Sequence, residues 1–128
     1  MDIVVNASPL ILLCKAGHIR LLEKLGRRVF VPRAVVNEVS AYPEDEAGRL
    51  VQSFSWLKQV DVAIPDSIKA WDLGAGESEV IAYALQCGGV RPLLDDAEGK
   101  SCALAHGLNP IGRAQVISAG VLAGDAAC

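Results

Sequence analysis

The chain has 128 residues, a formal net charge of -3 and 52% hydrophobic residues, which suits a single compact domain over 1–128 and excludes wholesale disorder. Only 5% of the residues are aromatic, so the core is expected to be aliphatic, and RNA recognition by rows of stacked rings is disfavoured. The mild acidity also argues against nonspecific coating of nucleic acid, which needs clustered Lys and Arg.

Charge is distributed unevenly along the chain. Up to Ile64 there are eight basic and seven acidic residues, whereas from Pro65 onward there are four basic and eight acidic residues. The second half is therefore where acid-based chemistry is expected.

Cysteine usage and hydropathy indicate the compartment. The four cysteines lack the spacing of a zinc site or a disulfide framework, which favours reduced thiols. The apolar run from Ile3 to Cys14 is too short to cross a bilayer, and the sequence shows no signal peptide. A cytoplasmic protein without a membrane anchor is expected.

Hydrophobic periodicity and helix caps predict the secondary structure. Short aliphatic runs indicate buried strands, apolar residues three and four apart indicate helices, and Ser8 is predicted to cap the first helix. In the first half, the predicted elements are a strand at 3–5, a helix from 8 toward 17, a helix at 18–25, a strand at 29–31, a helix from 32 to Tyr42, a short helix over 44–54 and a strand at 56–62. A loop is predicted over 64–76. The second half then has a helix at 77–86, a strand at 90–94, a helix at 97–106, a weak edge strand at 110–111, a helix at 114–122 and a frayed end over 123–128.

Strands that alternate with helices predict a three-layer α/β/α fold with a central parallel sheet. Such sheets bind ligands at the carboxyl ends of their strands. Asn6 follows the first strand, and Asp95 and Asp96 follow the strand at 90–94, so their side chains converge if those two strands are neighbours. The alternative for each residue alone is that it caps the next helix.

Two glutamates are predicted to face the core. Glu77 shares a helix face with the apolar residues three and four positions later, whereas Glu79 falls on another side and is predicted to point outward. Glu38 lies within the apolar stripe of its own helix and is also predicted to point inward. A carboxylate that faces a core costs several kcal/mol unless it is paired or coordinates a cation.

Two explanations for these buried acids stay open. An ion pair would compensate each one alone, and the candidate partners are Arg33, Lys100 and Arg113. Taken together, however, four acids are predicted near one edge of the sheet, namely Glu38, Glu77, Asp95 and Asp96. They outnumber the basic residues near them, so their mutual repulsion favours a bound divalent cation. Oxygen ligands without a cluster of His or Cys suit Mg²⁺ or Mn²⁺ better than zinc.

Several segments, spread over most of the chain, carry a resemblance. They are IVVNASPLI at 3–11, VP at 31–32, VNEV at 36–39, LGAGESEVIA at 73–82, LLDD at 93–96 and GLNPIG at 107–112. In this order the sequence resembles PIN domains, and within them a small prokaryotic PIN-like group of unknown function, akin to VapC-type toxins.

The resemblance implies a PIN fold, divalent metal at a cluster of acids, and endoribonuclease activity by metal-assisted hydrolysis. It places the four acidic positions of the family at Asn6, Glu38, Glu77 and Asp96, with Asp95 beside the last of them. Asn6 is a departure, because an amide offers an oxygen without a negative charge and should weaken cation binding and water activation.

Two further positions are assigned by the same resemblance. Ser8 matches a small hydroxyl residue that often follows the first acid, whereas Arg113 stands where the group often has a small hydroxyl residue. Both are candidate contacts for the RNA substrate.

The leading hypothesis is a Mg²⁺- or Mn²⁺-dependent ribonuclease in which Glu38, Glu77 and Asp96 hold the metal, Asn6 adds a neutral ligand and Asp95 acts as a helper base. The alternative is a degenerate PIN module that binds a protein or RNA without cutting it.

Resemblance also suggests partners. A small antitoxin protein could cover the acidic groove, and the helices between Leu10 and Leu25 could support a homodimer. A third class, a phosphoryl-transfer or nucleotide-binding domain, rests only on Gly74 and Gly76 together with Asp95 and Asp96. The glycine pair lacks the lysine of a P-loop.

Overall fold

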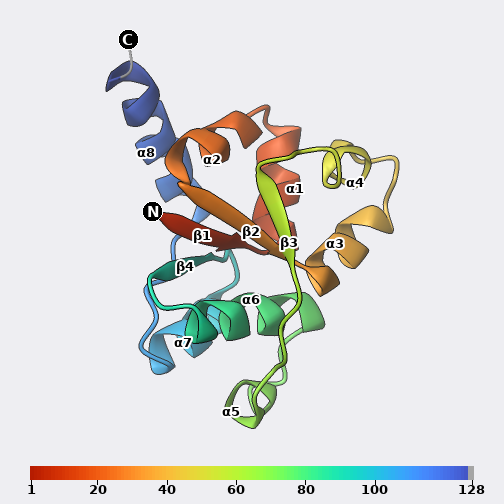
Figure 1. Cartoon of the computed structure of the whole chain (residues 1–128), viewed down its shortest axis with the longest axis vertical. Coiled ribbons are helices and arrows are strands. Elements are labelled where there is room, and N and C mark those ends of the chain that lie inside the picture. Colours follow the sequence, from red (N-terminus) through yellow and green to blue (C-terminus); the bar gives the residue numbers. More distant parts are fainter. Residues whose placement is uncertain (127–128) are drawn as a thin grey trace.

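The computed structural model describes the backbone of residues 1–126 and the side chains of residues 1–122. Its centre is an all-parallel sheet with the strand order β3-β2-β1-β4 (Figure 1). The strands are β1 (Asp2–Val5), β2 (Arg28–Pro32), β3 (Leu57–Val60) and β4 (Val90–Leu93). The predicted parallel sheet is therefore confirmed.

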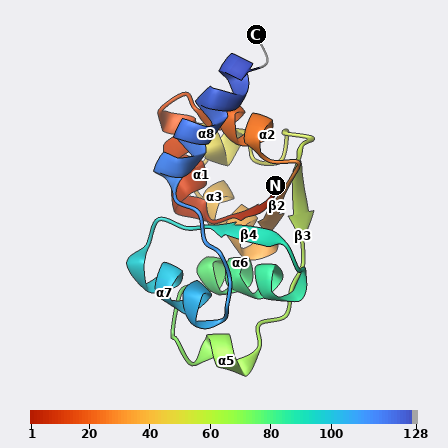
Figure 2. The same ribbon diagram turned by 90° about the vertical axis from the view of Figure 1, so that its left-hand side faces the viewer.

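Helices cover both faces of this sheet. Figure 2 shows α6, α7 and α5 on one side and α1, α2, α3 and α8 on the other. The helices are α1 (Ala7–Lys15), α2 (Ile19–Leu25), α3 (Arg33–Ser40), α4 (Glu46–Leu50), α5 (Asp66–Lys69), α6 (Ala75–Gln86), α7 (Ala97–Ala105) and α8 (Arg113–Ala126). The three layers confirm the predicted α/β/α architecture.

The core is aliphatic, as the composition predicts. Ile3, Val4 and Val5 of the central strand β1 are fully buried, and among the buried hydrophobic residues Phe30 is the aromatic one. Such a strand is apolar on both faces because helices pack on both sides of the sheet. No helix within the described part of the chain is long and apolar enough to cross a membrane.

The start of α1 differs from the prediction. The helix begins at Ala7, and Asn6 occupies the N-cap position in an extended conformation, without a side-chain capping bond. Asn6 still belongs to the sheet through its N–H, which donates to the carbonyl oxygen of Leu93 at 3.2 Å. The prediction that Ser8 caps the helix is therefore wrong, and Ser8 lies exposed in the first turn.

Three other boundaries differ. The predicted loop over 64–76 contains α5 and the first residues of α6, because Pro65 and Gly74 stand at the N-cap positions of these helices. The predicted edge strand at 110–111 is a single parallel bridge between Leu93 and Ile111. Helix α8 continues to Ala126, beyond the predicted end at 122, and residues 127–128 of the predicted frayed end lie outside the described residues.

Candidate functional site

The carboxyl ends of β1 and β4 meet at one edge of the sheet. These strands are neighbours, with Val5 opposite Leu93. The residues that follow them, Asn6 on one side and Asp95 and Asp96 on the other, therefore leave the sheet side by side. The condition on which the predicted convergence depended is met.

A pocket of about 350 Å³ opens at this edge, where α1, α3 and α6 approach one another. It brings together four of the predicted site residues, Asn6, Ser8, Glu38 and Glu77. The rest of its lining consists of the small residues Ala7, Ala34, Gly74, Ala75 and Gly76. Polar oxygens thus project into a space that small residues keep open.

Gly76 leaves room between Asn6 and Glu38. A Cβ atom at position 76 would lie 3.0 Å from Oε2 of Glu38 and 3.3 Å from Oδ1 of Asn6. The two oxygens therefore border the same small volume above the backbone of α6, and a larger residue there would displace them.

Asn6 and Glu38 differ in exposure. Asn6 is buried, with 6% of its surface exposed, whereas Glu38 is exposed at the rim. The prediction that Glu38 faces the core is wrong, because α3 buries Val35, Val36 and Val39 and leaves Glu38 beside that stripe. The rim position gives the Glu38 side chain freedom to move.

Glu77 is half-buried in the first turn of α6, and its Oε2 is buried without a hydrogen-bond partner. A Cβ atom at Gly99 would lie 2.8 Å from this oxygen, so α7 approaches the carboxylate closely only because position 99 is glycine. Burial, followed by the negative charge of Asp96 and then those of Glu38 and Glu98, raises the pKa of Glu77 above its ordinary value. Glu77 is thus a desolvated acid among other acids.

Asp96 and Asp95 have different surroundings. Asp96 is exposed and caps α7, since one of its oxygens accepts a hydrogen bond from the N–H of Gly99 at 2.9 Å. Asp95 is half-buried and accepts from the N–H of Arg113 at 3.4 Å, while its other oxygen is buried without a partner. Asp95, Asp96 and Arg113 are not among the residues that line the pocket. The hydrogen bond of Asp95 joins the end of β4 to the start of α8.

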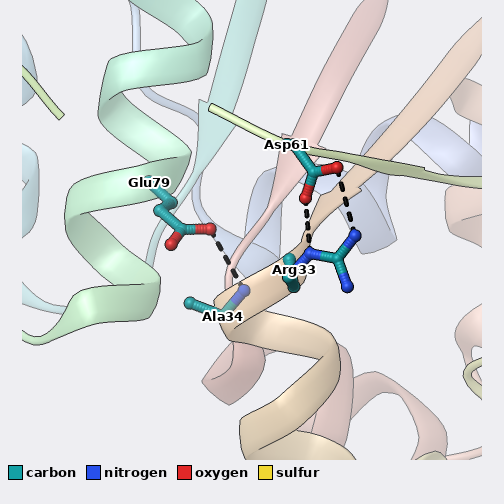
Figure 3. Close-up of polar contacts among 4 residues, drawn as sticks. All are labelled: Arg33, Ala34, Asp61 and Glu79. Carbon is teal, nitrogen blue, oxygen red and sulfur yellow. Dashed lines mark hydrogen bonds and ion pairs between the residues drawn. The ribbon is translucent and has the colours of Figure 1, made fainter. Parts of the chain in front are cut away.

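Basic residues do not neutralise these acids. The ion pairs within the described part of the chain join Arg20 to Glu23, Arg28 to Asp2 and Arg33 to Asp61. Arg33, a candidate partner for the buried glutamates, is instead paired with Asp61, at 2.6 Å and 3.1 Å (Figure 3).

Glu79 has a role that the sequence analysis missed. Its carboxylate accepts a hydrogen bond from the N–H of Ala34 at 3.1 Å, across the gap between α6 and α3 (Figure 3). The prediction that Glu79 points outward is wrong, because α3 covers that side of α6. The contact joins the helix that carries Glu38 to the helix that carries Glu77. One signal was present: Pro32 at the N-cap of α3 has no capping oxygen in its side chain, which leaves the first N–H groups of the helix open to an acceptor from another element.

Comparison with known families settles what kind of domain this is. The model of a family described as "PIN domain" matches residues 2–125. The chain belongs to the PIN domain family. No curated protein matches the sequence. The family match agrees with the three-layer parallel architecture and supports a nuclease-type fold.

The donor set of this PIN domain suits a hard divalent cation. It consists of oxygens only, one amide from Asn6 and carboxylates from Glu38, Glu77 and Asp96, and it includes a buried oxygen of Glu77 that lacks a partner. Within the described residues, no three Asp, Glu, His or Cys side chains are close enough together to hold an ion as they stand. The exposed side chains of Glu38 and Asp96 are the ones with freedom to turn toward it.

Proposed function

We propose that this PIN domain is a Mg²⁺- or Mn²⁺-dependent endoribonuclease, which hydrolyses RNA phosphodiester bonds at the pocket between α1, α3 and α6. The observation that carries the proposal is Glu77. Its carboxylate is half-buried, has an oxygen without a hydrogen-bond partner, and faces Asp96 and Glu38 rather than a base. Such an arrangement is unfavourable for an ionised carboxylate unless a cation or a proton compensates its charge.

Each site residue has a part in the proposed reaction. Glu38, Glu77 and Asp96 would hold the cation, with the amide oxygen of Asn6 as a neutral ligand. A bound divalent ion supplies an activated water at neutral pH and stabilises charge on the departing oxygen. Asp95 would serve as a helper base, held at the end of β4 by its hydrogen bond from the N–H of Arg113.

Substrate contacts would come from both sides of the site. Ser8 lines the pocket and is exposed, so its hydroxyl can donate to a phosphate oxygen. Arg113 begins α8 outside the pocket, and its guanidinium would contact RNA as the strand leaves the site.

Cleavage products provide the first test. With Mn²⁺ the protein is expected to cut a mixed-sequence RNA into fragments with 5′-phosphate and 3′-hydroxyl ends, and a chelator should stop the reaction. Attack by water, with the 3′ oxygen departing, gives these ends, whereas attack by the ribose 2′-hydroxyl gives a cyclic phosphate. The ends are checked by ligation and by phosphatase treatment. Cyclic phosphate ends, or cleavage that persists in chelator, would contradict metal-assisted hydrolysis.

A PIN module that binds without cutting is the second candidate, and Asn6 favours it because one acidic position of the family lacks its charge here. A small antitoxin, a second copy of the chain or an RNA strand would be its partner, in the cytoplasm. This candidate needs no metal.

Metal binding discriminates between the two candidates. Mn²⁺ at about a hundred times its Kd stabilises a native state by about 2.7 kcal/mol, so the nuclease is expected to melt several degrees higher with Mn²⁺ than with chelator. Differential scanning fluorimetry measures the shift, and Glu77→Gln, which loses a ligand, should show a smaller one. An unchanged melting temperature in the parent protein would favour the binding module.

A further inference from the structure

A second pocket, of about 320 Å³, is lined by Trp71, Ala97, Glu98 and Ser101. Ala97 directly follows Asp96 in the chain, so the pocket begins one residue from a proposed metal ligand. The second pocket is therefore next to the proposed site of hydrolysis.

The pocket is lined from two segments of different chemistry. Trp71 belongs to the turn that follows α5, whereas Ala97, Glu98 and Ser101 belong to the first two turns of α7. Ser101 lies four residues after Ala97 and three after Glu98, so it is a helix-surface neighbour of both. The lining therefore combines an aromatic residue with a carboxylate and a hydroxyl.

Trp71 is held in place but left partly uncovered. The backbone N–H of Trp71 donates to the carbonyl oxygen of Ile68 at 3.0 Å, and Ile68 is fully buried, so the turn is anchored to the core. Trp71 is nevertheless 38% exposed. The other tryptophan, Trp56, is half-buried and packs against Phe54, with ring centroids 5.2 Å apart.

We propose that the second pocket holds one nucleobase of a single-stranded RNA substrate, stacked on Trp71, with the exocyclic amine of the base donating to the carboxylate of Glu98. Stacking on an indole accepts any base, since every base has a π face. A carboxylate acceptor favours bases that carry an amine, as in the pairing of Glu with cytosine N4. Cytosine is thus preferred over uracil at this position.

Several observations favour a base as the occupant. The volume lies at the lower end of the range for small-molecule sites, which suits a flat heterocycle. The proximity to Asp96 puts the base next to a phosphate that the acidic site would hold, so this inference rests on the proposed function. A low aromatic content excludes rows of stacked rings, whereas a single ring is enough for one base.

Nucleosides test the pocket without the nuclease reaction, because cytidine and uridine have no phosphate to bind a metal or to be cut. In chelator, cytidine is expected to quench the fluorescence of Trp71 saturably, at a concentration about tenfold lower than uridine. The quenchable part of the signal should disappear in Trp71→Phe, where Trp56 remains. Glu98→Ala should keep the quenching but bring the two nucleosides to similar affinities.

RNA cleavage gives the second measurement. With Mn²⁺, Trp71→Ala is expected to raise KM by at least about fivefold with little change in kcat, and Trp71→Phe, which keeps a ring, should restore most of the loss. If nucleosides bind at Trp71 but RNA is not cut, the pocket stands and the proposed nuclease function fails. If RNA is cut while Trp71→Ala keeps the parental KM and no nucleoside quenches Trp71, the pocket proposal is overturned.

Discussion

Glu77→Gln is expected to reduce Mn²⁺-dependent RNA cleavage by at least about a hundredfold, and also to raise the melting temperature of the protein in chelator. Loss of activity follows because an amide replaces the acid most directed into the site, and charge stabilisation by a metal centre contributes several kcal/mol to such reactions. Cleavage is measured as initial rates on a labelled RNA, and stability by thermal unfolding in chelator.

The gain in stability of Glu77→Gln depends on pH. Burial and the charge of Asp96 raise the pKa of Glu77 above its ordinary value near 4.5. The native state therefore binds this proton more tightly than the unfolded chain, and the stability from the protonated form is lost as the pH rises through the raised pKa. Glutamine is neutral at every pH, so its advantage should be largest at neutral pH and vanish at about pH 4.

Asp96→Asn separates the two roles of Asp96. Asparagine caps a helix about as well as aspartate, so α7 and the bond to the N–H of Gly99 should persist with little loss of stability. The charge is removed, however, and cleavage should fall to a similar extent as in Glu77→Gln. A folded Asp96→Asn protein without activity would show that the carboxylate has a function beyond the cap.

Glu44→Gln is the matched control for both variants. It removes one charge from an exposed glutamate that lines neither pocket, and it should leave cleavage unchanged. If Glu77→Gln and Asp96→Asn both cut RNA at the parental rate, the site is assigned wrongly.

The convergence of Asn6, Asp95 and Asp96 could be predicted from the sequence because parallel strands impose it. Each residue follows a short aliphatic run, and the carboxyl ends of neighbouring parallel strands point to the same edge. The sequence does not specify which strands are neighbours, so the prediction was conditional until the pairing of β1 with β4 was known.

The orientations of Glu38 and Glu79 could not be predicted in the same way. Periodicity within a helix identifies its buried stripe, which in α3 consists of Val35, Val36 and Val39. It does not specify which other helix lies across the remaining sides. Because α3 packs against α6, Glu79 contacts the N–H of Ala34, while Glu38 lies at the open rim.

The starts of two helices were not predicted correctly, for a related reason. Ser8 is a good capping residue by type, but the hydrogen bond from the N–H of Asn6 to Leu93 keeps Asn6 in the sheet, and the helix follows at once. A contact between two strands thus overrode a local capping preference. Helix α5, with four residues, is too short for any periodic pattern to appear.

Asn6→Asp is expected to tighten Mn²⁺ binding by at least about tenfold while lowering the melting temperature in chelator. The amide oxygen of Asn6 is buried and borders the same space as the Glu38 carboxylate. A charge about 4 Å from an ion gains about 4 kcal/mol per unit charge at an effective dielectric constant of about 20, which exceeds the 1.4 kcal/mol that a tenfold gain requires. Part of this gain offsets the cost of burying another carboxylate.

The same substitution has opposite effects in the two conditions. Without metal, the new charge repels Glu77, Glu38 and Asp96, so the variant should melt below the parent; with saturating Mn²⁺, the order should reverse. Calorimetric titration gives the affinity, thermal unfolding gives the crossover, and Gln52→Glu adds one charge at an exposed position outside both pockets as the control. A variant that melts lower in chelator without binding Mn²⁺ more tightly would mean that Asn6 is a structural residue and that its amide is not a metal ligand.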